Sequence, residues 1–384
     1  MTPALLRQYA RLFIPVLFVI SGSLASRGHA QADLDGLGPA LEAIRAEHDL
    51  PAMSGAIVTA EGIRHLATVG VRKKNDPDQT PATDDDLWHL GSCGKAITAT
   101  LIARLVEAGT LRFDQTLAES FPDAADELPE SHRGITLHQL LTHRSGLPAN
   151  FTLLAYVQET DPAAARRKVF RETIDTPLAH APGSAYLYSN WGYTLAGHVA
   201  ERAAGKPFEQ LLRDEVFGPL GMTTAGFGGT GTLGQIDQPW PHTGNGRPTL
   251  INGPAMDNLP VMAPAGTIHM SMRDWAKFVA EHLKGRQGQS DFLSRDTFRR
   301  LHTPAEEVIG DDHYALGWNA VKRGWAGDAR ALNHGGDNTM NHATAWLAPA
   351  RGFAVLVATN QSRAQAANDA AATALILAWL NAQD

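Results

Sequence analysis

The chain has 384 residues, of which 43% are hydrophobic and 19% are charged. This composition is typical of a globular protein, and the length predicts two domains or one domain with a large insertion. The formal net charge is −7, from 33 basic and 40 acidic residues, which disfavours nucleic-acid binding because phosphate neutralisation needs clustered Lys and Arg.

The N-terminus has the pattern of an export signal. Arg7 and Arg11 precede an apolar run over residues 12–20, and small residues follow up to residues 30–32. This order predicts a cleavable signal peptide over residues 1–32 and therefore a secreted or periplasmic protein. The run is too short to span a bilayer comfortably, so an uncleaved membrane anchor is the weaker alternative.

The next segments predict one helix and two strands. Leu37, Leu41 and Ile44 recur at helical spacing. Residues 53–59 and 65–69 are apolar and rich in strand-forming types, with a turn between them at Glu61-Gly62. We expect a helix followed by a β-hairpin.

Ser92 and Lys95 are three residues apart at the start of a predicted helix. The helix is indicated by apolar residues at helical spacing, and Gly109 ends it. Residues three apart share a helix face, so Lys95 could take the proton of the Ser92 hydroxyl and make it a nucleophile. Taken alone, the tetrapeptide fits equally well a serine helix cap followed by a surface lysine. The apolar residues are Ile97, Leu101, Ile102, Leu105 and Val106.

Cys93 is the only cysteine, so no disulfide can form within the chain. It could be a reactive thiol beside Ser92 or a small apolar side chain of the core. Residues adjacent in a helix do not share a face, so we favour burial in the helical core. His132, His138 and His143 show no metal-binding spacing and are interpreted as structural.

The rest of the chain completes an α+β pattern. Residues 91–260 have mainly helical periodicity, strands return at 342–347 and 353–359, and a helix is expected over 364–380. We therefore predict one antiparallel sheet built from both chain ends and flanked by the N- and C-terminal helices. A sheet domain is expected over 33–90 and 261–384, a mainly helical domain over 91–260, and the site at their junction.

Two further motifs give the chain a family resemblance. Tyr188-Ser189-Asn190 lies in a loop leading into a helix, and His334-Gly335-Gly336 precedes the C-terminal hairpin. Together with Ser92-x-x-Lys95, they resemble the motifs of the serine β-lactamase and penicillin-binding superfamily. The Tyr-x-Asn form resembles the class C β-lactamase-like branch, which includes D-alanyl-D-alanine carboxypeptidases, D-aminopeptidases and family VIII carboxylesterases. The resemblance runs from about residue 34 to the end, with supporting segments at 135–148, 219–222 and 264–266.

The resemblance implies an acyl-enzyme mechanism. Ser92 would attack a carbonyl, while Lys95 and Tyr188 would share the role of general base. Tyr188 would also protonate the leaving group. A free phenol has a pKa near ~10, so Tyr188 would need the positive charge of Lys95 to act as a phenolate.

The resemblance also implies the substrate contacts. Asn190 would hold an amide or carboxyl end of the substrate. Gly335 and Gly336, which follow His334, would let a substrate backbone lie close against that strand. The N–H groups of Ser92 and Asp337 would form the oxyanion hole. An ionised Asp337 carboxylate would oppose negative charge there unless it points away.

The predicted function is an exported serine hydrolase that acts through an acyl-Ser92 intermediate on an amide or ester, with D-amino-acid peptides of cell-wall type as one substrate class. The alternatives are a carboxylesterase on short-chain esters and a β-lactamase, which His334 disfavours because class C β-lactamases have lysine there. A non-catalytic peptidoglycan-binding or sensor module is disfavoured because a pure binder needs no base beside a serine. An α/β-hydrolase is disfavoured because Leu90 replaces the first glycine of Gly-x-Ser-x-Gly.

No cofactor or metal is implied. The expected partner is a small-molecule or peptide substrate, without nucleic acid and without a membrane span after signal cleavage. The sequence does not determine the oligomeric state.

Overall fold

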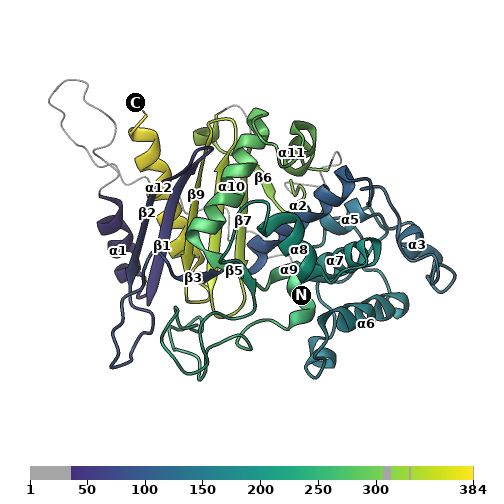
Figure 1. The fold of residues 1–384 in the computed structure, drawn as a ribbon, viewed down its shortest axis with the longest axis horizontal. Helices are drawn as coiled ribbons and strands as arrows, with labels where there is room; N and C mark the ends of the chain where they lie inside the picture. The colour runs from purple at the N-terminus through teal and green to yellow at the C-terminus, as the bar shows by residue number, and fades with distance from the viewer. Residues whose placement is uncertain (1–35, 306–312, 328–329, 384) are drawn as a thin grey trace, which may run out of the picture.

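Both ends of the chain meet in one antiparallel sheet with the strand order β2-β1-β9-β8-β7-β6. The computed structural model describes residues 36–305, 313–327 and 330–383, so the predicted signal peptide over residues 1–32 lies outside the described residues. Strand β1 pairs with β2 on one side and β9 on the other, which joins the first and last strands of the chain (Figure 1). The strands are β1 (Ala52–Thr59), β2 (Gly62–Gly70), β6 (Asn319–Lys322), β7 (Arg330–Asp337), β8 (His342–Ala348) and β9 (Phe353–Thr359).

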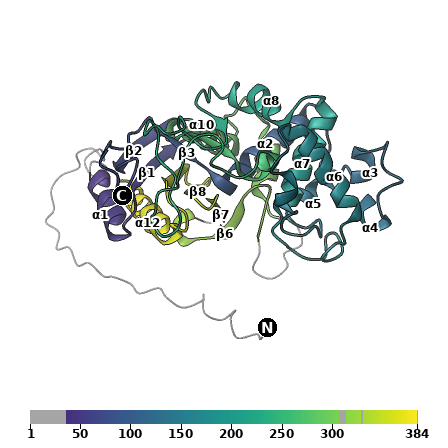
Figure 2. The same cartoon turned by 90° about the horizontal axis from the view of Figure 1, so that it is seen from below.

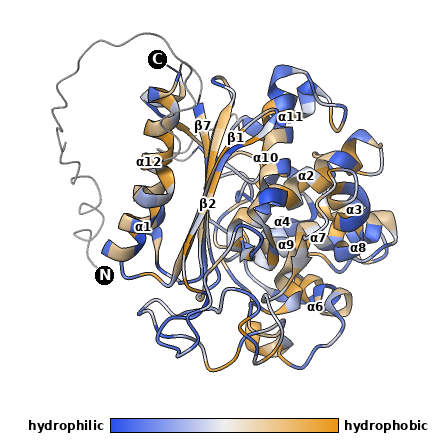
Figure 3. Cartoon of the chain, turned by 60° about the vertical axis from the view of Figure 1, so that its left-hand side comes forward, coloured by the Kyte–Doolittle hydropathy of each residue, from blue (hydrophilic) through white to orange (hydrophobic). Residues whose placement is uncertain are grey.

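Helices cover both faces of this sheet. The two terminal helices, α1 (Leu37–Glu47) and α12 (Gln365–Asn381), pack on one face, and α10 (Met272–Gln287) packs on the other (Figure 3). All eight residues of β1 are consequently buried. A strand buried on both faces has a nearly continuous apolar sequence, which explains why the region around residues 53–59 could be recognised as a strand.

The remaining helices lie beyond α10, on the side of the molecule away from α1 and α12 (Figure 2). Most of them come from the middle of the chain, where helical periodicity was expected. Their bounds are α2 (Gly94–Glu107), α3 (Leu117–Ser120), α4 (Glu130–Arg133), α5 (Leu137–Leu141), α6 (Pro162–Asp175), α7 (Asn190–Ala204), α8 (Phe208–Leu212), α9 (Ala263–Gly266) and α11 (Arg295–His302).

A second, small sheet was not predicted. It has the order β3-β5-β4 and joins segments that are far apart in the sequence. Its strands are β3 (Leu87–His89), β4 (Gly226–Phe227) and β5 (Ile268–Ser271), with two to four residues each. Strands this short show no alternation of apolar and polar residues. The sheet matters for the site because β3 leads directly into the turn that contains Ser92.

Two apolar clusters form the core. The larger one extends from one face of the six-stranded sheet into the helices, and the smaller one fills the space between the other face and helices α1 and α12. Because the larger cluster contains residues from both predicted domains, the boundaries at residues 90 and 261 stay a prediction.

The predicted fold class, an antiparallel sheet with flanking terminal helices and a mainly helical middle, is confirmed. Strands β6 and β7 add to the two C-terminal strands expected from the sequence. The glycine pair in β7 weakens the strand pattern, since glycine is depleted in strands. Among the described residues, no helix has the length and apolarity needed to cross a membrane.

Candidate active site

Ser92 lies in a short 3₁₀ turn, Gly91–Cys93, between β3 and α2. It is partly exposed, whereas both neighbours in the turn are buried. The turn requires glycine at residue 91, because its φ is +50° and a Cβ there would lie 2.7 Å from the backbone nitrogen of Asp337. The serine hydroxyl is thus the accessible group of a tightly packed turn.

Lys95 lies on the first turn of α2 and is completely buried. Its Nζ donates to Ser92 Oγ at 3.0 Å, to Asn190 Oδ1 at 2.8 Å and to the carbonyl oxygen of Ala265 at 2.6 Å. Burial lowers the pKa of Lys95 to about 7. A large fraction of the amine is therefore neutral at pH 7. A neutral amine can use its two N–H groups for Asn190 and Ala265, and its lone pair can accept the proton of Ser92.

Tyr188 lies in the loop before α7, and its hydroxyl hydrogen-bonds to the Ser92 side chain. The Lys95 Nζ is 4.9 Å from the centroid of its ring. Burial raises the pKa of Tyr188 above its ordinary value, opposite to the direction expected for a phenolate stabilised by Lys95. A protonated phenol suits donation of a proton to the leaving group.

The imidazole of His143 packs against the ring of Tyr188, and the two ring centroids are 4.3 Å apart. It is completely buried, and its backbone has a φ of +60°. Its Nδ1 accepts the backbone N–H of Ser189 at 3.0 Å. Burial, followed by the positive charge of protonated Lys95, holds the pKa of His143 well below its usual range. The histidine interpreted as structural is a neutral support for Tyr188.

Asn190 is the first residue of α7, and both ends of its amide are engaged. Its Oδ1 accepts from Lys95, and its Nδ2 donates to Asn150 Oδ1 at 2.8 Å. Its predicted contact with substrate stays a prediction. Asn150 was missed by the sequence analysis, because a single asparagine in a loop gives no motif.

His334 belongs to β7 and is only 3% exposed. Its Nδ1 donates to the Gly335 carbonyl at 2.7 Å, so its Nε2 accepts the Tyr314 hydroxyl at 2.9 Å. Burial, followed by the charge of Lys95, lowers the pKa of His334 to about 3. The imidazole is therefore neutral, and its predicted contact with substrate stays a prediction. Tyr314 is a buried site residue that no sequence motif indicated.

The two glycines of β7 have different surroundings. A Cβ at Gly335 would meet nothing within 4 Å, so this residue borders open space. A Cβ at Gly336 would lie 2.0 Å from the Leu90 carbonyl oxygen and 2.7 Å from the Ser92 nitrogen. The expectation that both glycines make room for a substrate is therefore corrected: Gly336 makes room for the turn that carries Ser92.

Asp337 directs its carboxylate away from the turn and into its own hydrogen bonds. The carboxylate accepts from Ser362 Oγ at 2.8 Å, from the Arg363 N–H at 2.7 Å, and from His342 and Thr339. Burial opposes the charged form, but these hydrogen bonds outweigh it and lower the pKa of Asp337 to about 2. Its backbone nitrogen adjoins Gly91, so the N–H groups of Ser92 and Asp337 belong to two segments in contact.

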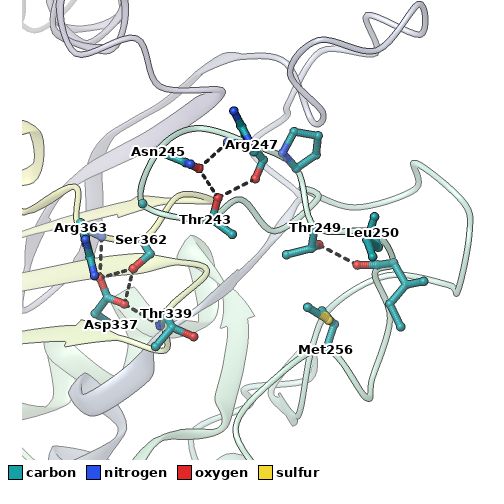
Figure 4. A pocket seen from close by; sticks show the side chains of 13 residues that line it. Thr243, Asn245, Arg247, Thr249, Leu250, Met256, Asp337, Thr339, Ser362 and Arg363 are labelled. Carbon is teal, nitrogen blue, oxygen red and sulfur yellow. Dashed lines mark hydrogen bonds between the residues drawn. The ribbon is translucent and has the colours of Figure 1, made fainter.

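A cavity of about 1150 Å³ begins at Asp337, at the end of β7 (Figure 4). Its other wall is the loop over residues 243–256, which contributes the apolar side chains of Leu250, Ile251 and Met256. Leu250 is 99% exposed. The hydroxyl of Thr249 donates to the backbone carbonyls of Pro241 and Ile251. The cavity therefore offers mainly apolar contact, and Asp337 is the one predicted site residue that lines it.

Cys93 is buried against the sheet and not among the helices. Its Sγ lies 3.2 Å from the His334 carbonyl oxygen and 3.7 Å from that of Ala343. Burial raises the pKa of the thiol to about 12. The expected burial is present, against β7 and β8, and a thiol of this kind is a poor nucleophile.

Residues 39–378 match the family model described as Beta-lactamase. The chain is 32% identical over 181 residues to Penicillin-binding protein 4 of Amycolatopsis lactamdurans, covering 47% of this chain and 46% of that protein. It is 29% identical over 200 residues to the lovastatin esterase of Penicillium rubens, covering 47% of this chain and 50% of that protein. The chain thus spans about half the length of these curated relatives.

Solved structures share the fold. The D-alanine carboxypeptidase AmpC from Burkholderia cenocepacia superposes with a TM-score of 0.72 at 21% identity, covering 91% of this chain and 99% of that one. At this identity the likeness concerns the fold alone. The family resemblance read from the three motifs is confirmed by the match over most of the chain.

Proposed function

We propose that this chain cleaves an ester or amide through an acyl-enzyme on Ser92. The chain belongs to the Beta-lactamase family and is a serine hydrolase. The observation that carries the proposal is the buried Lys95 amine, with a pKa of about 7 and its Nζ 3.0 Å from Ser92 Oγ. A nucleophile in contact with a neutral base is the arrangement that acyl transfer requires.

In the acylation step, Ser92 Oγ attacks the substrate carbonyl and its proton passes to the Lys95 amine. The N–H groups of Ser92 and Asp337 would bind the negative oxygen of the tetrahedral intermediate, each donor contributing about 3 kcal/mol. The Tyr188 hydroxyl gives its proton to the leaving group, and the Lys95 ammonium then reprotonates Tyr188. Water then attacks the acyl carbonyl. A proton of this water passes through Tyr188 and Lys95 to Ser92 Oγ, which leaves as the free hydroxyl.

The substrate class that we favour is an ester or amide with an apolar acyl group. The cavity beside Asp337 has an apolar wall, and a neutral His334 supplies no positive charge on β7 for a substrate carboxylate. Hydrolysis of peptides that end in a D-amino acid is the second candidate, and the relatives named penicillin-binding protein favour it. We also propose export through the signal peptide predicted over residues 1–32.

The test is the intact mass of the protein after benzylpenicillin, together with hydrolysis of p-nitrophenyl esters and of D-alanyl-D-alanine peptides. Ser92→Ala is compared with the wild type, and Ser184→Ala, an exposed serine in the loop before Tyr188, is the control. We expect ester hydrolysis to disappear only in Ser92→Ala. Any acyl adduct should likewise require Ser92. Hydrolysis that survives Ser92→Ala would overturn the proposal.

A further inference from the structure

Three buried polar side chains connect the Ser92 turn to the end of β7. His89 ends β3, Asp257 lies in the loop before α9, and Asn338 follows β7. His89 is 3% exposed, Asn338 1%, and the side chain of Asp257 1%. Polar groups at this depth normally require hydrogen-bond partners, and these three supply them to one another.

The hydrogen bonds converge on the Asp257 carboxylate from both ends of this series. The N–H of Gly91 donates to His89 Nδ1 at 3.0 Å, so the hydrogen of a neutral His89 is on Nε2. Nε2 donates to Asp257 Oδ2 at 2.8 Å. The other carboxylate oxygen, Oδ1, accepts from Asn338 Nδ2 at 2.7 Å.

Each end of this series of bonds is one residue from a backbone N–H to which we assign the role of oxyanion donor. Gly91 precedes Ser92, and Asn338 follows Asp337. Apart from the contact of Cys93 Sγ with the His334 carbonyl oxygen, the Ser92 and Asp337 segments meet through backbone packing, in which only glycine fits at residues 91 and 336. Packing limits how close the segments come, whereas directed hydrogen bonds to buried side chains also limit how far apart they move.

We propose that His89, Asp257 and Asn338 form a positioning bridge that sets the separation of the two oxyanion donors, the N–H groups of Ser92 and Asp337. The inference rests on the proposed acyl transfer at Ser92. Such donors act only when they lie 2.7–3.1 Å from the place that the oxyanion takes, so a small displacement of either segment weakens them. None of the three side chains touches the reacting atoms.

The decisive variant is Asp257→Asn, which conserves the volume of the side chain. Its amide oxygen can still accept from Asn338, but its NH₂ group faces His89 Nε2. His89 then has to carry its hydrogen on Nδ1, where it opposes the N–H of Gly91. The variant therefore breaks the bridge at the Ser92 turn without leaving a cavity.

The control is Asp274→Asn. Asp274 is also buried and accepts hydrogen bonds from Thr224 and Lys277, remote from the bridge. The measurements are kcat and KM for p-nitrophenyl acetate and the inhibition constant of phenylboronic acid, whose tetrahedral adduct on serine places an oxygen in the oxyanion hole. Thermal unfolding and titration of the active fraction accompany them.

We expect Asp257→Asn to lower kcat about 30-fold, with little change in KM, and to weaken phenylboronic acid by a similar factor. This is less than the 10²–10³-fold effect of removing an oxyanion donor outright. Asp274→Asn should have a kcat and a phenylboronic acid inhibition constant close to those of the wild type. The bridge is refuted if Asp257→Asn loses only stability or active fraction while phenylboronic acid binds as before.

Asn338→Ala cuts the other end of the bridge and serves if Asp257→Asn does not fold. It should lower kcat and phenylboronic acid affinity together, and normal values of both would equally refute the bridge. The same assays on Ser92→Ala separate this outcome from a failure of the proposed function. If hydrolysis does not depend on Ser92, the proposed function is wrong.

Discussion

The two sides of the site around Ser92 use different chemical groups: side chains on one side and backbone N–H groups on the other. On one side are the two side chains to which we assign proton transfer, Lys95 on α2 and Tyr188 in the loop before α7. On the other side, backbone N–H groups of the Ser92 turn and of β7 meet across a contact that only glycine permits at residue 336.

The two sides therefore depend on different properties of the protein. The proton-transfer side depends on which side chain is present and on its burial, which gives Lys95 a pKa of about 7. The strand side depends on where the backbone lies. Substitutions on the first side should remove a chemical group and alter the pH dependence, whereas those on the second should displace donors and leave the pH dependence unchanged.

The largest effect is expected from Lys95→Met, which keeps the length of the side chain and removes the base. We expect kcat/KM for an ester substrate to fall by about 10³-fold, within the range for loss of a general base. Steady-state kinetics beside circular dichroism would measure it. Lys277→Met, which removes a half-exposed lysine on α10, is the control. A Lys95→Met enzyme with a tenth of wild-type activity would contradict the assignment of the base.

Gly336→Ala should displace the backbone donors on the β7 side of the site. The new Cβ would lie 2.0 Å from the Leu90 carbonyl oxygen, so β7 or the Ser92 turn has to move. We expect a loss of about 10²-fold in kcat/KM, comparable to losing an oxyanion donor. Gly335→Ala is the matched control, because a Cβ there meets nothing within 4 Å. Equal activity of the two variants would show that the close approach at Gly336 has no role in the reaction.

The pH dependence should separate the two sides. Neutral Lys95 is the active form, so kcat/KM should rise about tenfold per pH unit below pH 7 and level off above its pKa of about 7. His334, with a pKa lowered to about 3, stays neutral across this range. The Tyr188 phenol stays protonated, because burial raises its pKa.

The same profile tests the comparison directly. In Gly336→Ala the curve should be lower throughout but keep its midpoint, because the base is untouched. A wild-type profile that is flat between pH 6 and 8, or a midpoint that moves in Gly336→Ala, would contradict the division into two sides.

The smallest effect is expected in the cavity beside Asp337. Leu250→Asp should lower kcat/KM for p-nitrophenyl octanoate relative to the acetate by about fivefold, since each buried methylene contributes about 0.8 kcal/mol. Leu233→Asp replaces another exposed leucine, outside the cavity lining, and should leave the ratio unchanged. An unchanged ratio in Leu250→Asp would remove the argument for an apolar acyl group.

The elements that could be predicted from the sequence are those with local patterns. The strand of residues 52–59, the C-terminal hairpin and the terminal helices have runs long enough to show periodicity. Ser92 lies in the 3₁₀ turn that runs directly into α2, three residues before Lys95, so their contact follows from local helical geometry. Strand β3 and the other short strands escaped because two to four residues carry no period.

The sequence by itself determined which reactive side chains the protein has and that Ser92 and Lys95 lie together. Only the tertiary structure decided the burial that lowers the pKa of Lys95, the packing of His143 against Tyr188, and the bridge through His89 and Asp257. The reason is physical. Local hydrogen bonding and periodicity fix neighbours within a few residues, whereas desolvation and contacts between distant segments exist only once the chain has packed.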